Sequence, residues 1–195
     1  MKTIRTLFAG LALILLAPVA LHAQSPLSLE IRGGIAVPMG DFADGAQTGV
    51  GFGGTASFQI LPVFDVYAGY SWTRFGIDDD GDLDGADVDL TDSGFAVGGR
   101  LYLAPIGNIA PWVQGGVLLH QLEISGSEGG VSASVTSDRG VGFEAGGGVA
   151  IPVGTNISFM PGVRYRQYPA QFGDDDDDAG DVQYIALDLG VRLRF

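Results

Sequence analysis

One short acidic segment has the residue spacing of a calcium-binding loop. Asp80, Asp82 and Asp84 alternate with other residues and precede Gly85. This is the D-x-D-x-D-G opening of an EF-hand-like loop, in which carboxylates converge on Ca²⁺ and glycine permits a sharp turn. The twelfth position is Thr91 and not the bidentate glutamate of that loop. We therefore expect either ordered Ca²⁺ binding by Asp80, Asp82 and Asp84, or a solvated loop that holds divalent cations loosely; no other cofactor is expected.

Acid is concentrated in two segments of the chain. Residues 76–93 hold eight aspartates, and residues 169–181 hold six, of which five are consecutive (174–178), so the two segments contain 14 of the 23 acidic residues. The formal net charge is −13, which repels nucleic-acid phosphates and attracts cations or a basic surface partner. Cysteine is absent, which excludes disulfides and thiolate metal sites.

Nucleophilic catalysis is the third chemistry to consider. His120 is the single histidine after residue 23, and Ser71 or Ser125 with Glu123 would have to complete a Ser–His–carboxylate set around it. Glu123 and His120 fall on opposite faces of any strand that holds both, because side chains alternate along a strand. We therefore expect a protein that is not an enzyme.

The elements that position these residues are long alternating strands. Residues 183–195 (QYIALDLGVRLRF) alternate strictly between apolar and other residues and end on Phe195. Soluble strands are typically about 5–6 residues long, whereas a strand that crosses a bilayer at a tilt needs about 9–11. The length and the continuous apolar face predict a transmembrane β-barrel.

The whole chain divides into strands of this kind and polar connections. Short connections near 61–62, 105–109 and 152–156 alternate with long ones over 38–49, 76–93, 125–139 and 169–181, as short periplasmic turns and longer extracellular loops alternate in outer-membrane barrels. Aromatic residues near strand ends, including Trp112 and Phe195, are expected to form lipid-facing girdles. The fold class is therefore an all-β, eight-stranded, antiparallel up-and-down transmembrane β-barrel. Its predicted strands cover 27–37, 50–61, 63–75, 94–104, 110–124, 141–151, 157–168 and 183–195.

Nine charged residues fall on the inner face of these strands. They are four acids and five arginines, nearly neutral as a set: Glu30, Arg32, Asp65, Arg100, Glu144, Arg164, Arg166, Asp188 and Arg192. An eight-stranded barrel has an interior just wide enough for side chains to fill, and buried charges must pair to be tolerated. We expect a packed lumen of arginine–carboxylate pairs. The alternative is a water-filled interior that solvates these groups and lets small ions leak.

The first 23 residues have the pattern of a secretory signal peptide. Lys2 and Arg5 form a basic region before an apolar stretch over residues 7–21, and Ala23 precedes the expected cleavage site. Residues 24–195 then form one barrel domain. Without Lys2 and Arg5, eight arginines face 23 acids, so the net charge of this domain is 8 − 23 = −15.

The strand count, the loop alternation, the charged inner face and the terminal Phe195 together resemble the OmpA/OmpX-type small outer-membrane barrels of Gram-negative bacteria. The resemblance implies a location in the outer membrane, contact with its lipids and lipopolysaccharide, and recognition of Phe195 by the barrel-assembly machinery. It implies no single activity, because such folds carry several. We expect a structural or interaction role for the acidic loops. A narrow OmpW-like channel for small or hydrophobic solutes is the alternative, and a lipid A-modifying enzyme the third.

Overall fold

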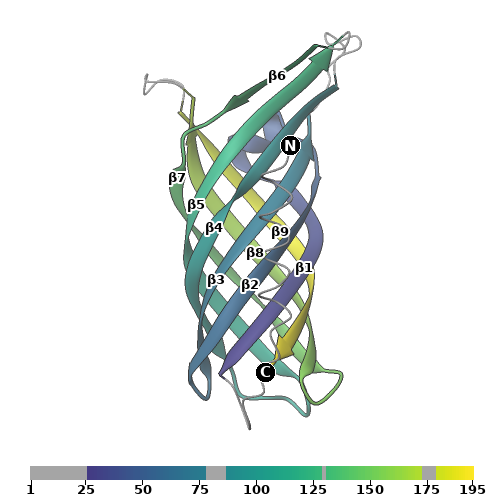
Figure 1. The fold of residues 1–195 in the computed structure, drawn as a ribbon, viewed down its shortest axis with the longest axis vertical. Helices are drawn as coiled ribbons and strands as arrows, with labels where there is room; N and C mark the ends of the chain where they lie inside the picture. The colour runs from purple at the N-terminus through teal and green to yellow at the C-terminus, as the bar shows by residue number, and fades with distance from the viewer. Residues whose placement is uncertain (1–25, 78–86, 129–130, 173–178) are drawn as a thin grey trace, which may run out of the picture.

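The strands close into a barrel, as Figure 1 shows. The computed structural model describes residues 26–77, 87–128, 131–172 and 179–195. Each of eight strands pairs antiparallel with its neighbours, and pairing of the first with the last closes the ring. The all-β, eight-stranded prediction is thus confirmed. The strands of the ring are β1 (Leu27–Pro38), β2 (Gly49–Leu61), β3 (Phe64–Gly76), β4 (Asp87–Tyr102), β5 (Ala110–Glu128), β7 (Gly140–Pro152), β8 (Ile157–Gln171) and β9 (Ala179–Arg194).

The polarity of the barrel is inverted relative to a soluble protein. Apolar side chains such as Ile31 and Phe52 point outward and are 71% and 63% exposed, whereas Arg100 points inward and is 1% exposed. This follows from strict alternation, because each strand places every second residue on the same face. An apolar outer band around a polar interior suits acyl chains and not water.

The two ends of the barrel differ. Short turns join β2 to β3, β4 to β5 and β7 to β8 at one end, where the first and last strands also meet: the Phe195 amide donates to the Leu27 carbonyl over 3.1 Å. By the rule of outer-membrane barrels this end is periplasmic. β3 and β8 end, and β4 and β9 begin, at the opposite, extracellular end (Figure 1).

Three predicted loops, 76–93, 125–139 and 169–181, are longer than the connections in the structure; for the last of them, β8 runs to Gln171 and β9 begins at Ala179. β4 begins at Asp87 and not at residue 94, and β5 runs on to Glu128, where it pairs with an additional strand, β6 (Val131–Thr136). β6 pairs with β5 alone, so β4, β5 and β6 rise beyond the ring as a three-stranded sheet (Figure 1). The physical reason is that backbone pairing across these strands continues although the sequence turns polar.

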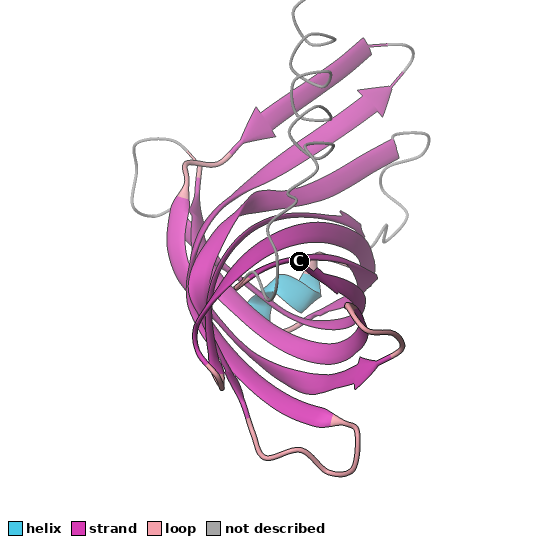
Figure 2. Ribbon diagram, turned by 60° about the horizontal axis from the view of Figure 1, so that its bottom comes forward, coloured by secondary structure: helices cyan, strands magenta, loops and turns pink. Residues whose placement is uncertain are grey.

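The extracellular mouth is filled by apolar residues. A 3₁₀ turn, η1 (Gly40–Asp44), lies across the ring (Figure 2), and its Phe42 meets Phe75 with ring centroids 5.2 Å apart. Phe75, Leu118 and Tyr168 are fully buried within one cluster below it. The described helical segments include none long and apolar enough to span a membrane. The predicted signal peptide, residues 1–23, lies outside the described residues.

Candidate functional site in the barrel interior

Arg100 is the anchor of a charged layer in the periplasmic half of the barrel. Its Nη1 donates to Glu30 Oε2 over 2.6 Å, and its Nη2 donates to Gln114 Oε1 over 3.0 Å. Arg32 Nη1 donates to Glu30 Oε1 over 3.3 Å. The Arg100 guanidinium also lies 4.6 Å from the centroid of the Trp112 ring. Glu30 thus pairs with two arginines, and the guanidinium of one of them, Arg100, also interacts with an aromatic face.

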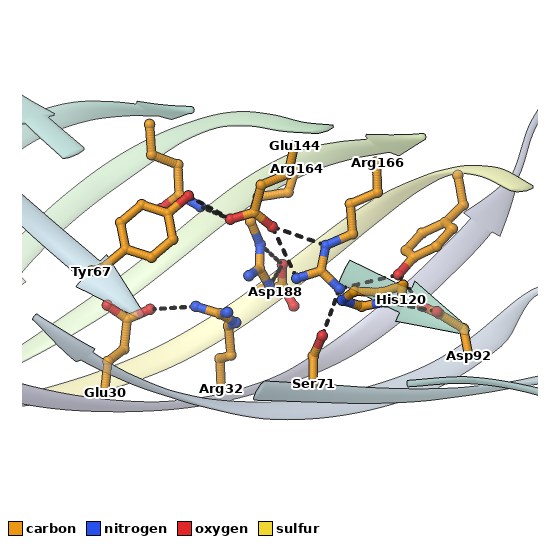
Figure 3. Close-up of polar contacts among 12 residues, drawn as sticks. Glu30, Arg32, Tyr67, Ser71, Asp92, His120, Glu144, Arg164, Arg166 and Asp188 are labelled. Carbon is orange, nitrogen blue, oxygen red and sulfur yellow. Dashed lines mark hydrogen bonds and ion pairs between the residues drawn. The ribbon is translucent and has the colours of Figure 1, made fainter. Parts of the chain in front are cut away.

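Glu144 is the centre of the next layer, as Figure 3 shows. Its Oε1 accepts from the Tyr67 hydroxyl over 2.6 Å and from Gln114 Nε2 over 3.1 Å, and its Oε2 accepts from Arg166 Nε over 3.0 Å. Arg166 donates in turn to the Ser71 hydroxyl over 2.8 Å. Tyr67 and Ser71 lie on β3, Gln114 on β5, Glu144 on β7 and Arg166 on β8, so this network ties opposite walls of the barrel together.

Two further ion pairs complete the set. Arg192 Nη2 donates to Asp65 Oδ2 and to the Ser28 hydroxyl, each over 2.6 Å. Arg164 Nε donates to Asp188 Oδ2 over 2.9 Å. The structure therefore places all nine sequence-predicted lumen residues in ion pairs with one another. Two cavities among these described residues measure about 20 and 10 Å³, and a single water needs roughly 10–15 Å³.

Asp92 forms a polar cluster that sequence reasoning missed. Its Oδ1 meets His120 Nδ1 and accepts from the Tyr168 hydroxyl, both at 2.7 Å, while its Oδ2 accepts from the Tyr184 hydroxyl over 2.6 Å. The Arg166 guanidinium also donates to Tyr184 over 3.1 Å. The cluster therefore continues the Glu144 network toward the extracellular mouth (Figure 3).

The burial of His120 bears on the catalytic set considered from the sequence. His120 and Asp92 are both 0% exposed, so no substrate reaches the imidazole in this conformation. Ser71 is engaged by Arg166, and Glu123 and Ser125 lie in the part of β5 that pairs with β6 above the ring. The structure does not bring Ser71, Ser125 or Glu123 together with His120 as a nucleophile, base and acid.

The predicted metal ligands Asp80, Asp82 and Asp84 lie outside the described residues. Among the residues that are described, no group of three or more histidine, cysteine or acidic side chains could hold a metal ion. The strands around the segment are nevertheless fixed: Gly76 of β3 pairs with Asp89 of β4. β3 therefore ends, and β4 begins, at the extracellular end.

The prediction that Trp112 belongs to a lipid-facing aromatic girdle is wrong. Trp112 is 4% exposed and packs inside the barrel with Ala150 and Met160. The alternation itself would have placed it inward, since Val113 on the neighbouring position faces lipid. An interior arginine, Arg100, supplies the contact that makes an inward tryptophan favourable.

Comparison with known proteins identifies the family. The sequence profile described as "Outer membrane protein beta-barrel domain" matches residues 9–195. The chain belongs to this family. It is therefore an integral β-barrel protein of the Gram-negative outer membrane, and the resemblance to small outer-membrane barrels is confirmed. No curated protein sequence matches the chain.

Solved structures support the fold. Neisserial surface protein A has 18% sequence identity and a TM-score of 0.63, and the match covers 89% of this chain and 100% of that one. A major outer membrane protein from Thermus thermophilus has 14% identity and a TM-score of 0.60 over the same shares. The attachment invasion locus protein of Yersinia pestis, Ail, has 16% identity and a TM-score of 0.55, again over 89% and 100%. At these identities the likeness concerns the fold of the outer-membrane barrel alone.

Proposed function

We propose that this protein is a closed outer-membrane barrel that presents acidic segments at the cell surface to divalent cations and, through them, to lipopolysaccharide or a basic partner. The observation that carries the proposal is the filled interior: nine charged side chains pair with one another, and two cavities between the described residues there measure about 20 and 10 Å³. A barrel whose lumen is occupied by its own side chains acts through its rims.

The register of the strands supports a single acidic surface. β3 and β4 pair up to Gly76 and Asp89, and β8 and β9 pair up to Gln171 and Ala179. The strands that flank both acid-rich segments of the sequence therefore end at the extracellular rim. Asp41 of η1 is exposed at the same end. Carboxylates gathered on one rim repel one another, and divalent cations relieve that repulsion.

Calorimetry on the folded barrel in a non-ionic detergent tests cation binding. We expect a saturable Ca²⁺ isotherm, and we expect Asp80→Asn and Asp84→Asn each to weaken it by about tenfold, since loss of one charged ligand removes roughly 1.5 kcal/mol or more. Asp138→Asn is the matched control, because it removes one exposed carboxylate at the same end without touching the D-x-D-x-D-G segment. Non-saturating heats that the variants leave unchanged would refute ordered binding.

Two further measurements separate this proposal from the other functions that the fold admits. In planar bilayers we expect no discrete conductance steps, because the interior is packed; regular open steps would favour an OmpW-like channel. We expect His120→Ala to leave the lipid A of producing cells unchanged, because the imidazole is buried; loss of a lipid A product would favour an enzyme.

Recognition of the last strand by the barrel-assembly machinery is part of the proposal. Phe195 is 39% exposed at the periplasmic end, and the β1–β9 pairing that closes the ring ends beside it. An aromatic side chain at the end of β9 is accessible to the assembly machinery before β9 pairs with β1 and closes the ring.

A further inference from the structure

The periplasmic end of the barrel contains a cavity much larger than the two described in the lumen. This cavity of about 400 Å³ lies among the ends of β4, β8 and β9 and the periplasmic turns. We call it the periplasmic vestibule. Its polar lining includes Tyr102, Asn108, Thr155, Ser158, Arg192 and Arg194. Small-molecule sites have volumes of about 300–1,000 Å³, so the vestibule is of that size, whereas the cavities deeper in the lumen are not.

The vestibule carries the opposite charge to the rest of the protein. Among the described residues that line it there are two arginines and no carboxylate, in a chain with 23 acids and ten basic residues. The nearest acid of the lumen, Asp65, is fully buried and its Oδ2 accepts from Arg192. Arg194 is exposed at the rim of the cavity. An anion that enters the vestibule therefore meets guanidinium and hydroxyl groups.

Two buried groups of the lining lack partners. Arg192 is 4% exposed, and its Nε has no hydrogen-bond partner in the described part of the chain; the Tyr102 hydroxyl is likewise buried without one. Buried polar groups in native proteins are nearly always satisfied, and an unsatisfied one calls for an explanation such as a bound molecule. The Arg192 guanidinium carbon lies 5.4 Å from the centroid of the Tyr102 ring, so the two side chains lie together at the wall of the vestibule.

Arg194 is held in place by its backbone. Its amide donates to the Asn156 carbonyl over 2.8 Å, and the Asn156 side-chain amide donates to the Arg194 carbonyl over 2.9 Å. These two bonds join the end of β9 to the turn between β7 and β8. The side chain that carries the free positive charge thus starts from a fixed position at the cavity rim.

We propose that the periplasmic vestibule binds the phosphate group of an organic phosphate. The donors come from several directions, with Arg192 and Arg194 on β9, Tyr102 on β4 and Ser158 on β8. A tetrahedral phosphate presents acceptor oxygens in several directions, and arginine binds such oxygens with charge-assisted bonds. The apolar part of the lining, such as Leu103 and Pro152, would contact the organic portion. The phosphate is that of a soluble ester or of a phospholipid headgroup in the periplasmic leaflet.

Titration calorimetry of the folded, full-length mature barrel in a non-ionic detergent tests this proposal. The probes are glycerol 3-phosphate and a short-chain phosphatidylglycerol. We expect saturable binding of at least one of them. Arg194→Gln should weaken it by about tenfold or more, because one charged hydrogen bond is lost, and Tyr102→Phe should weaken it less. Arg139→Gln, which removes an exposed arginine at the opposite end where it bonds to Gln121, should bind like the wild type.

Binding of glycerol 3-phosphate, with or without binding of the lipid, indicates a soluble phosphate ester as ligand. Binding of the lipid alone indicates a headgroup. Either result supports the site if Arg194→Gln weakens the binding. No saturable heat with either probe overturns the proposal, as does equal weakening by Arg194→Gln and Arg139→Gln. The heat-dependent gel shift of each variant shows whether it is folded, and the Ca²⁺ isotherm provides a second check, because it depends on the other end of the barrel.

Discussion

Replacing Glu144 by glutamine should destabilise the barrel strongly although it changes few atoms. The carboxylate accepts from Tyr67, Gln114 and Arg166, and an amide in its place turns one acceptor oxygen into a donor. Whichever way the amide is oriented, it faces at least one existing donor. Arg166 then keeps Ser71 and Tyr184 as partners but loses its nearest anion.

The size of the effect follows from burial. Breaking a buried ion pair from one side costs about 3–5 kcal/mol, and the remaining partners of Arg166 favour the lower end. We expect the free energy of unfolding to fall by about 3 kcal/mol, which corresponds to about a 150-fold shift in the folding equilibrium. Urea titration of the barrel in lipid vesicles, followed by tryptophan fluorescence and by the heat-dependent gel shift, measures it.

Asp89→Asn is the matched control for this prediction. It makes the same chemical change in the ion pair between Arg74 and Asp89, which is exposed at the extracellular end. Exposed pairs contribute about 0–1 kcal/mol, so this variant should unfold almost like the wild type. If Glu144→Gln costs no more than Asp89→Asn, the interior is solvated in the way that a water-filled lumen requires, and the packed lumen is wrong.

Two other perturbations probe different parts of the wall. Asp92→Asn should lower the free energy of unfolding by about 2 kcal/mol, because Tyr184 or another buried hydroxyl loses a charged acceptor; urea titration checks this, and an unchanged midpoint would contradict it. Gly34→Ala should prevent efficient folding, because a Cβ there overlaps the Leu187 backbone oxygen, whereas Gly33→Ala, next along the strand, meets only a carbonyl oxygen at 3.6 Å. Equal folding yields for these two alanine variants would show that the β1–β9 contact relaxes.

The parts of the fold that the sequence predicts are those that a two-residue period determines. The outward rows of β1 and β9 and the inward arginines follow from alternation alone, because a register shift of one residue would expose every charge to lipid. Strand ends at the extracellular rim do not follow from it. Asp89 and Asp92 look like loop residues, yet β4 includes both. Asp89 pairs with Arg74 outside the buried interior, and Asp92 is buried with His120 inside the barrel.

The Asp92 cluster shows which part of the site could have been found and which could not. Asp92 falls on the inward face of β4 with Gly94 and Ala96, and His120 falls on the inward face of β5. Extending the alternation of β4 by one step would therefore have placed a carboxylate close to a histidine on the neighbouring strand, because Asp92 pairs with Leu122 and Gly94 pairs with His120. The hydroxyls of Tyr168 and Tyr184 come from strands on the far side of the ring. Contacts across a lumen depend on barrel diameter and stagger, which no local pattern of residues encodes.

The distribution of charge links the interior to the proposed roles of the two ends. Inside the wall, five arginines are matched by carboxylates, because an unmatched charge there would be costly. The surplus acid therefore has to lie outside the wall, and the long extracellular connections are where the chain has room for it. Arg194, in contrast, lies beyond the last interior ion pair, at the periplasmic mouth. The two proposals therefore place a cation site and a phosphate site at opposite ends of an interior whose charges are paired.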